Sequence, residues 1–143
     1  MQPRALGKMA ELGLVRRLRR AGWSVLRAPA SGARSREPVP DVVAVKHGVI
    51  LMFEVKYRAR SRSIYMDAAK WDKLRRYAEQ AGAELYLAVK LRGEDDYRVL
   101  GWDVAEHVRM DDKEYMAWYK EVIDRAGTLT DLLARIARMK GWV

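Results

Sequence analysis

Two apolar segments joined by a short polar turn constrain the fold of this chain more than any other feature. Asp41 to Val45 and Val49 to Val55 are rich in branched apolar residues, which is typical of strands. The residues between them, Lys46-His47-Gly48, predict a hairpin turn. An antiparallel hairpin centred there brings residue 41 opposite the mid-50s.

Charged residues occur at selected positions of this predicted hairpin. Asp41 opens the first strand, and Glu54 and Lys56 lie two residues apart in the second. Alternate side chains of a strand share a face, so Glu54 and Lys56 point one way while Phe53 and Val55 point into the core. The sequence therefore predicts that Asp41, Glu54 and Lys56 converge.

Hydrophobic periodicity and turn residues predict the elements on either side of the hairpin. We expect helices over 4–21 and 66–81, strands over 23–27, 83–91 and 97–101, and helices over 103–109, 112–126 and 129–139. There is no internal repeat or interdomain linker. The prediction is one α/β domain over residues 1–143, with a core over about 5–101 and a helical C-terminal extension over about 102–143.

Positive charge is concentrated in the part of the chain that contains the hairpin. Residues 1–62 hold 14 Lys and Arg against four acids, whereas residues 63–143 hold 14 against 15. A general need for solubility does not confine charge to one end, but phosphate binding does explain such an excess. Three of the four acids, Glu11, Asp41 and Glu54, are the candidate site residues.

The composition narrows the class of protein further. There is no cysteine, which excludes disulfides and Cys-based zinc sites and fits a cytoplasmic protein. No apolar run approaches the length of a membrane span. The chain has no asparagine and two glutamines, and this scarcity of thermolabile amides favours a thermophilic source. A GC-rich genome would also favour the abundant arginine and alanine.

Carboxylates within a basic surface suit the hydrolysis of a phosphodiester. Asp41 and Glu54, with the carbonyl of Val55, could hold Mg²⁺, and Mn²⁺ could substitute for it. Lys56 would orient the attacking water or neutralise charge that develops on the phosphate. Glu11, at the edge of the buried stripe of the first helix, would be a further ligand, either direct or through water.

Less specific interpretations of these motifs remain open at this point. A Glu-Val-Lys strand is common on solvated faces, Pro-Asp is common in turns, and residues 29–40 could be a plain surface loop. His47 reads as a turn residue and His107 as a residue of a surface helix. The other aromatic positions of interest, Trp71, Trp102, Trp118 and Trp142, read as core or interface anchors.

The whole set of motifs resembles one family, the archaeal Holliday-junction resolvases called Hjc, within the PD-(D/E)xK nuclease superfamily. The resemblance covers about residues 5–101. The matching segments are Gly7 to Glu11, the Arg-Ala-Pro-Ala-Ser-Gly string at 27–32, Pro40-Asp41, Glu54-Val55-Lys56, and Gly82-Ala83 before a strand ending in Val89-Lys90. The string at 27–32 is the most specific of these, because the acid-acid-lysine pattern alone indicates only the superfamily.

This resemblance implies a restriction-endonuclease-like fold, with a central mixed five-stranded sheet flanked by helices. It implies an archaeal homodimer that nicks two opposing strands of a four-way DNA junction with a divalent metal and no organic cofactor. Glu11, Asp41, Glu54 and Lys56 would be the catalytic set, with Ser31 near the scissile phosphate. Many relatives follow the first acid with arginine, whereas Leu12 stands here, which puts one phosphate contact in doubt.

The candidate DNA contacts come from the basic half and from the loop at 29–40. They are Arg4, Lys8, Arg27, Ser31, Gly32, Arg34, Arg36, Arg58 and Arg60. Most contacts of this type position a nucleic acid without reading its sequence. Two alternatives stay open: another nuclease of the superfamily that acts on duplex or flap DNA, and a protein that binds branched DNA without cutting it.

Overall fold

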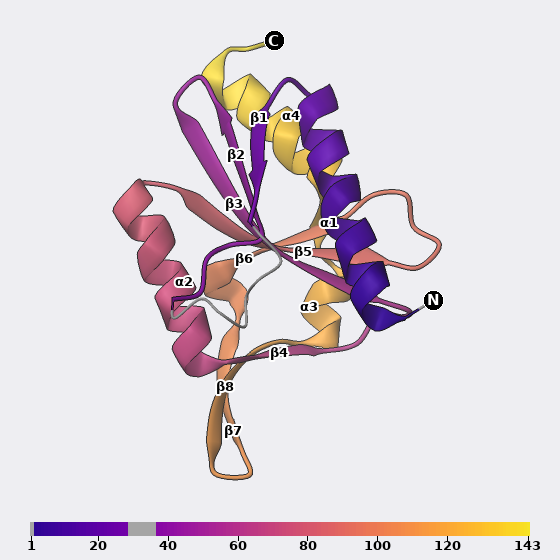
Figure 1. Cartoon of the computed structure of the whole chain (residues 1–143), viewed down its shortest axis with the longest axis vertical. Coiled ribbons are helices and arrows are strands. Elements are labelled where there is room, and N and C mark those ends of the chain that lie inside the picture. The colour runs from indigo at the N-terminus through magenta and orange to yellow at the C-terminus, as the bar shows by residue number, and fades with distance from the viewer. Residues whose placement is uncertain (1, 29–36) are drawn as a thin grey trace.

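A six-stranded mixed sheet forms the centre of the computed structural model, which describes residues 2–28 and 37–143. Its strand order is β1-β2-β3-β5-β6-β9, and every neighbouring pair is antiparallel except β3 and β5, which are parallel (Figure 1). The bounds are β1 Ser24–Arg27, β2 Val42–Lys46, β3 Val49–Arg58, β5 Glu84–Leu91, β6 Arg98–Gly101 and β9 Gly127–Thr128.

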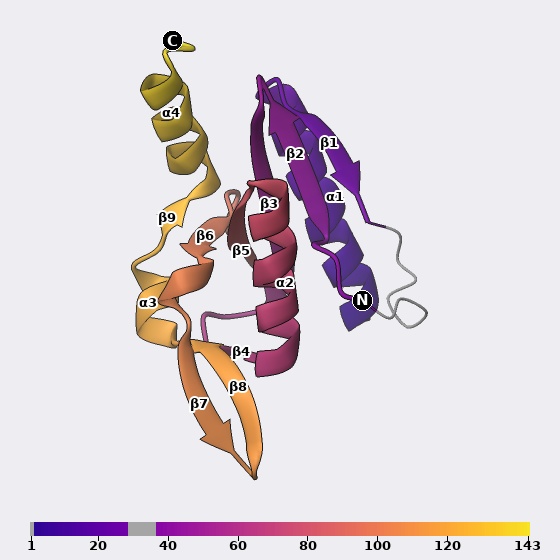
Figure 2. The same ribbon diagram turned by 90° about the vertical axis from the view of Figure 1, so that its left-hand side faces the viewer.

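Helices cover both faces of this sheet. On one face, α1 (Pro3–Arg20) and α4 (Leu129–Lys140) contribute to a core that includes Phe53 and Val55. On the other face, α2 (Ala68–Ala81) packs Leu74 and Ala78 over strand residues such as Leu87 (Figure 2). Because each face has its own helical layer, alternate residues of β3 are buried in different cores, and Glu54 points toward the α2 layer.

A second, three-stranded sheet extends from the main body. Its order is β4-β8-β7, with bounds β4 Ile64–Asp67, β8 Lys113–Trp118 and β7 Glu106–Met110. The β7–β8 hairpin projects beyond the other elements in both views (Figures 1 and 2). Two short helices flank this sheet in the chain, η2 over Trp102–Val104 and α3 over Lys120–Asp124.

Most of the elements expected from periodicity are present. The helices over 4–21, 66–81 and 129–139 and the five core strands are confirmed, with shifts at their ends. Residues 64–67 form β4 rather than the start of α2, and Asp67 instead caps that helix by accepting the Ala69 N–H at 2.9 Å. The mixed sheet flanked by helices is also confirmed, with β9 added as a sixth strand.

Within the predicted helical C-terminal extension, the helix over 129–139 is present, but the helices over 103–109 and over most of 112–126 are wrong. Residues 103–109 and most of 112–126 form the β7–β8 hairpin and its surroundings, and its turn places Asp111 and Asp112 at positive φ, 50° and 60°. Pairing of β8 with β4, which is distant in sequence, overrides the helical pattern there. Beyond the hairpin, β9 and α4 join the central sheet and its core.

The tryptophans belong to the packing of the molecule. Trp102 and Trp118 are buried, and Trp71 is stacked on Trp102 with ring centroids 6.2 Å apart. Trp142, near the C-terminus, contacts the buried Trp23 edge to face. His47 lies in the β2–β3 turn, as predicted, but His107 lies on β7 and not on a helix. None of the described helices is long and apolar enough to cross a membrane.

Candidate active site

The β2–β3 register brings Asp41 next to Glu54. Val42 pairs with Phe53, so Asp41, one residue before β2, lies level with Glu54. Its side chain is fixed there, because the Val55 N–H donates a hydrogen bond of 2.8 Å to Asp41 Oδ2. The structure therefore confirms the predicted proximity of the two acids.

Glu54 is a carboxylate in a nearly closed environment. Its exposed fraction is 3%, and one oxygen, Oε2, forms an ion pair of 3.0 Å with Lys70 Nζ on α2. The other oxygen, Oε1, is buried and has no hydrogen-bond partner among the described residues. Burial and the charge of Asp41 raise the pKa of Glu54 to about 7, although Lys70 and Lys56 oppose that shift.

Glu11 approaches the same acids from the first helix. It is partly buried and accepts a hydrogen bond of 3.1 Å from Arg27 Nε on β1. Burial raises the pKa of Glu11, with a further contribution from the charge of Asp41, while Arg27 and Lys56 lower it. Asp41 thus acts electrostatically on both of the other acids, and Lys56 is near enough to oppose both shifts.

The donor set fits a hard divalent cation held by two carboxylates. In the ranges 2–28 and 37–143, no three His, Cys, Asp or Glu side chains meet closely enough to form a metal cage. Glu11 Oε1 accepts from Arg27 Nε, and the place of Glu11 in the three-acid set stays a prediction. However, Mg²⁺ often uses one or two carboxylates and keeps several waters. The free, buried Oε1 of Glu54 beside Asp41 is a position that a cation would satisfy.

The far end of β3, four residues beyond Glu54, leads into a basic segment. Arg58 is half-buried, and burial together with the nearby charge of Arg62 lowers its pKa. Arg60 and Arg62 are exposed, as are Arg4 and Lys8 on α1. Arginines that crowd one another in this way favour an anionic ligand.

Other predicted DNA-contact residues are either bonded within the protein or lie outside the described residues. Arg27 is engaged with Glu11. The loop residues Ser31, Gly32, Arg34 and Arg36 lie outside the described residues. The carbonyl of Val55 stays a predicted ligand.

Lys70 is a site residue that the sequence interpretation missed. It lies on the first turn of α2, 16 residues after Glu54, and the strand β4 intervenes. Nothing in the local sequence distinguishes it from Lys73, because both are lysines on an amphipathic helix. The one usable signal was the need of a buried Glu54 for a cation from the layer that covers its face.

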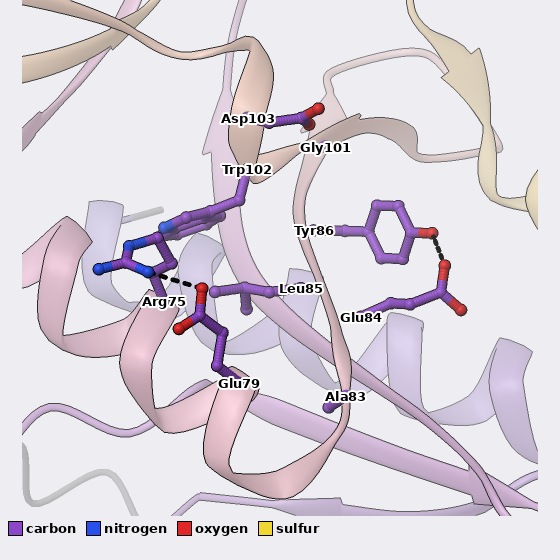
Figure 3. Close-up of a pocket in the computed structure, with 9 residues that line it drawn as sticks. All are labelled: Arg75, Glu79, Ala83, Glu84, Leu85, Tyr86, Gly101, Trp102 and Asp103. Carbon is purple, nitrogen blue, oxygen red and sulfur yellow. Dashed lines mark hydrogen bonds and ion pairs between the residues drawn. The ribbon is translucent and has the colours of Figure 1, made fainter.

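A recess of about 280 Å³ lies elsewhere on the molecule, between the end of α2, the start of β5 and η2. Figure 3 shows the Arg75–Glu79 ion pair on one wall and the Tyr86–Glu84 hydrogen bond on another. Tyr86 O–H donates to Glu84 at 2.8 Å. None of the predicted site residues lines this recess, so it is separate from the paired acids.

Known proteins are similar to this chain in sequence. The model of the family "Archaeal holliday junction resolvase (hjc)" matches residues 2–140. The crossover junction endodeoxyribonuclease Hjc of Sulfurisphaera tokodaii is 44% identical over 85 residues, which is 59% of either chain. Its namesake from Sulfolobus acidocaldarius is 40% identical over 91 residues, 64% of either chain. The matched part of this chain therefore spans about 60% of the length of these relatives.

A solved structure extends the similarity over most of the fold. Hjc of Archaeoglobus fulgidus, described as a Holliday junction resolvase from an archaeal hyperthermophile, superimposes with a TM-score of 0.74 at 25% identity. The match covers 90% of this chain and 95% of that one. The mixed sheet, with two acids brought together by β2 and β3, resembles that of the PD-(D/E)xK nuclease class. Within that class, the chain belongs to the archaeal Holliday junction resolvase (Hjc) family.

Proposed function

We propose that this chain is a structure-selective, divalent-metal-dependent endodeoxyribonuclease that resolves four-way DNA junctions by paired nicks. The observation that carries this proposal is Glu54, a buried carboxylate with one unpartnered oxygen, next to Asp41. These acids lie within a half of the chain that has an excess of ten positive charges. Membership of the Hjc family supports the choice of the junction as substrate.

The roles of the acids follow from their surroundings. Asp41 and Glu54 would hold Mg²⁺, with Mn²⁺ as a substitute, and the carbonyl of Val55 and the Glu11 carboxylate would complete the set directly or through water. A bound divalent ion supplies an activated water and relieves charge on the phosphate. Lys56, on the same strand face as Glu54, would neutralise charge that develops on the phosphate oxygens.

Cations around the acids would position the DNA backbone. Arg58 ends β3 and Arg60 follows it, four and six residues beyond Glu54, and Arg4 and Lys8 are exposed on α1. By family resemblance, Ser31 would lie near the scissile phosphate, and Gly32, Arg34 and Arg36 would contact the same DNA arm. Arg27 would act mainly through Glu11, because its guanidinium Nε is bonded there.

A homodimer would place one active site at each of the two DNA strands that are nicked. One chain carries one set of Glu11, Asp41, Glu54 and Lys56, so each chain would make one nick. A four-way junction has approximate two-fold symmetry, and closed two-fold dimers are the commonest oligomers. Light scattering at micromolar concentration should therefore give about twice the 16.5 kDa chain mass. A strictly monomeric protein that still makes paired nicks would contradict the dimer.

Cleavage of labelled substrates tests the proposal directly. A four-way junction, a linear duplex and a flap are incubated with the protein, with and without Mg²⁺. We expect paired symmetric nicks in the junction that require Mg²⁺, and little cutting of the duplex. Preferred cutting of duplex or flap would indicate another nuclease activity of the superfamily. Tight junction binding without any cutting would indicate a binding protein.

A further inference from the structure

We infer that Lys70 is a positioning residue for the active site, which fixes the Glu54 carboxylate so that its free oxygen faces the metal position. This inference rests on the proposed function, because it assumes that Glu54 is a metal ligand. It adds a residue from the α2 layer to a site otherwise formed by α1, β2 and β3.

The contact is specific and its two partners differ in burial. Lys70 Nζ lies 3.0 Å from Glu54 Oε2, and the exposed fractions of the side chains are 43% and 3%. The ammonium therefore reaches from the surface of α2 down to a carboxylate that is closed off from solvent. The start of the helix is itself fixed, because Asp67 caps it through the Ala69 N–H.

The two oxygens of Glu54 are in different situations. Oε2 is held by Lys70, whereas Oε1 is buried without a partner. A carboxylate fixed at one oxygen presents the other in a defined direction. The side chain is therefore already ordered before a metal binds. Lys70 contacts the oxygen opposite the free one, so it can remain in place when a cation binds to Oε1.

Asp41 makes this restraint necessary. Its negative charge acts on Glu54 from the neighbouring strand and favours any rotamer that moves the two carboxylates apart. Lys56 does not replace Lys70, because it lies on the same strand as Glu54 and has the weaker electrostatic influence of the two. Loss of Lys70 would therefore leave Glu54 buried, repelled by Asp41 and without a fixed orientation.

Mn²⁺ binding to the DNA-free protein tests this inference. Binding is measured by calorimetry and by electron paramagnetic resonance for the wild type, Lys70→Met, Lys70→Gln and Lys70→Arg. Lys73→Met is the matched control, since Lys73 lies exposed on the same helix and the charge change is the same. Thermal melting of each variant reports whether it is folded.

We expect Lys70→Met to weaken Mn²⁺ binding by about tenfold to a hundredfold, which is typical for partners that orient metal ligands. Lys70→Arg should restore most of the affinity, Lys70→Gln should be intermediate, and Lys73→Met should match the wild type. Metal-free affinity for the junction should fall no more in Lys70→Met than in Lys73→Met. If Lys70→Met is unfolded, the Mn²⁺ affinities of Lys70→Arg and Lys70→Gln test the inference instead, and Lys70→Arg should bind Mn²⁺ more tightly than Lys70→Gln.

Equal or tighter Mn²⁺ binding in the folded Lys70→Met or Lys70→Gln variants would overturn the inference, as would a wild type that binds no Mn²⁺. The binding measurements need no cleavage. If the wild type binds Mn²⁺ in a Lys70-dependent way but cuts no junction, the proposed activity fails and the positioning role of Lys70 stands.

Discussion

Two regions of this molecule differ in how well their buried polar groups are hydrogen-bonded. At the carboxylate edge, formed by Asp41, Glu54, Lys56 and Lys70, a buried acid has one free oxygen and a second acid beside it. In the small sheet, formed by β4, β8 and β7, Trp118 Nε1 donates to the Gly101 carbonyl at 3.1 Å. The nearby Trp102 Nε1 donates to the Trp71 carbonyl at 3.0 Å.

The charged side chains of the two regions differ in the same way. On the β7–β8 hairpin, Glu114 forms an ion pair with Arg109 across the strands, and His107 Nε2 contacts the same carboxylate. Next to the second region, Trp71 Nε1 on α2 is buried without a hydrogen-bond partner among the described residues, but it carries no charge. The comparison indicates that the small sheet is built for stability, whereas the carboxylate edge is held in an unfavourable state by the rest of the fold. Such local conflict is typical of functional sites.

The largest expected effect is on catalysis at the carboxylate edge. Glu54→Gln should abolish Mg²⁺-dependent nicking, a loss of at least about 10⁴-fold or ~5 kcal/mol, because a metal ligand is removed. Junction binding and the melting temperature at neutral pH should not fall, because a buried charge near Asp41 disappears. Cleavage and binding assays check both, with the exposed Glu121→Gln as control. Near wild-type cutting by Glu54→Gln would show that the site is assigned wrongly.

The next largest effect lies in the small sheet and should be on stability alone. Trp118 is fully buried and contacts Trp102 edge to face at 4.9 Å. Trp118→Ala should lower the free energy of unfolding by about 3–5 kcal/mol through the cavity and the lost hydrogen bond. Urea unfolding measures this change. At a temperature where the variant is folded, its nicking rate should stay within about threefold of wild type; a far larger loss would break the separation between the two regions.

Stability should also depend on pH through Glu54. Its pKa is raised from 4.5 to about 7 on folding, so between those values the folded protein binds more protons than the unfolded chain. This contribution is fully present below about pH 4.5 and is lost as the pH rises to 7, and it amounts to about 3 kcal/mol. Urea unfolding at several pH values in EDTA should show this decline, and Glu54→Gln should remove that part of it. The same pH dependence of the free energy of unfolding in the wild type and in Glu54→Gln would contradict the raised pKa of Glu54.

The smallest effect concerns DNA contacts. Arg60 and Arg62 are exposed just beyond the end of β3, so Arg60→Ala with Arg62→Ala should weaken junction binding. Each lost phosphate contact should reduce the slope of log K against log salt by about 0.9. The control Arg76→Ala with Lys120→Ala removes the same charge from ion pairs in the second half of the chain, and the slope should not change. Equal slopes for both double variants would place Arg60 and Arg62 off the DNA.

Local sequence was sufficient for the central part of this protein. The β2–β3 hairpin and the proximity of Asp41 to Glu54 depend on a two-residue turn, His47-Gly48, and on the alternation of strand side chains, both of which act over neighbouring residues. The paired acids and the basic segment around them were therefore predictable before any tertiary contact was known.

Only the tertiary structure determined the partners of these residues. Most of the residues expected to be helical over 103–109 and 112–118 form the strands β7 and β8, because β8 pairs with β4, some 50 residues earlier in the chain. Lys70 meets Glu54 because α2 packs on the face of β3 opposite α1, and Glu11 meets Arg27 because α1 lies against the edge strand. Such contacts depend on which surfaces bury one another, and a local pattern does not contain that information.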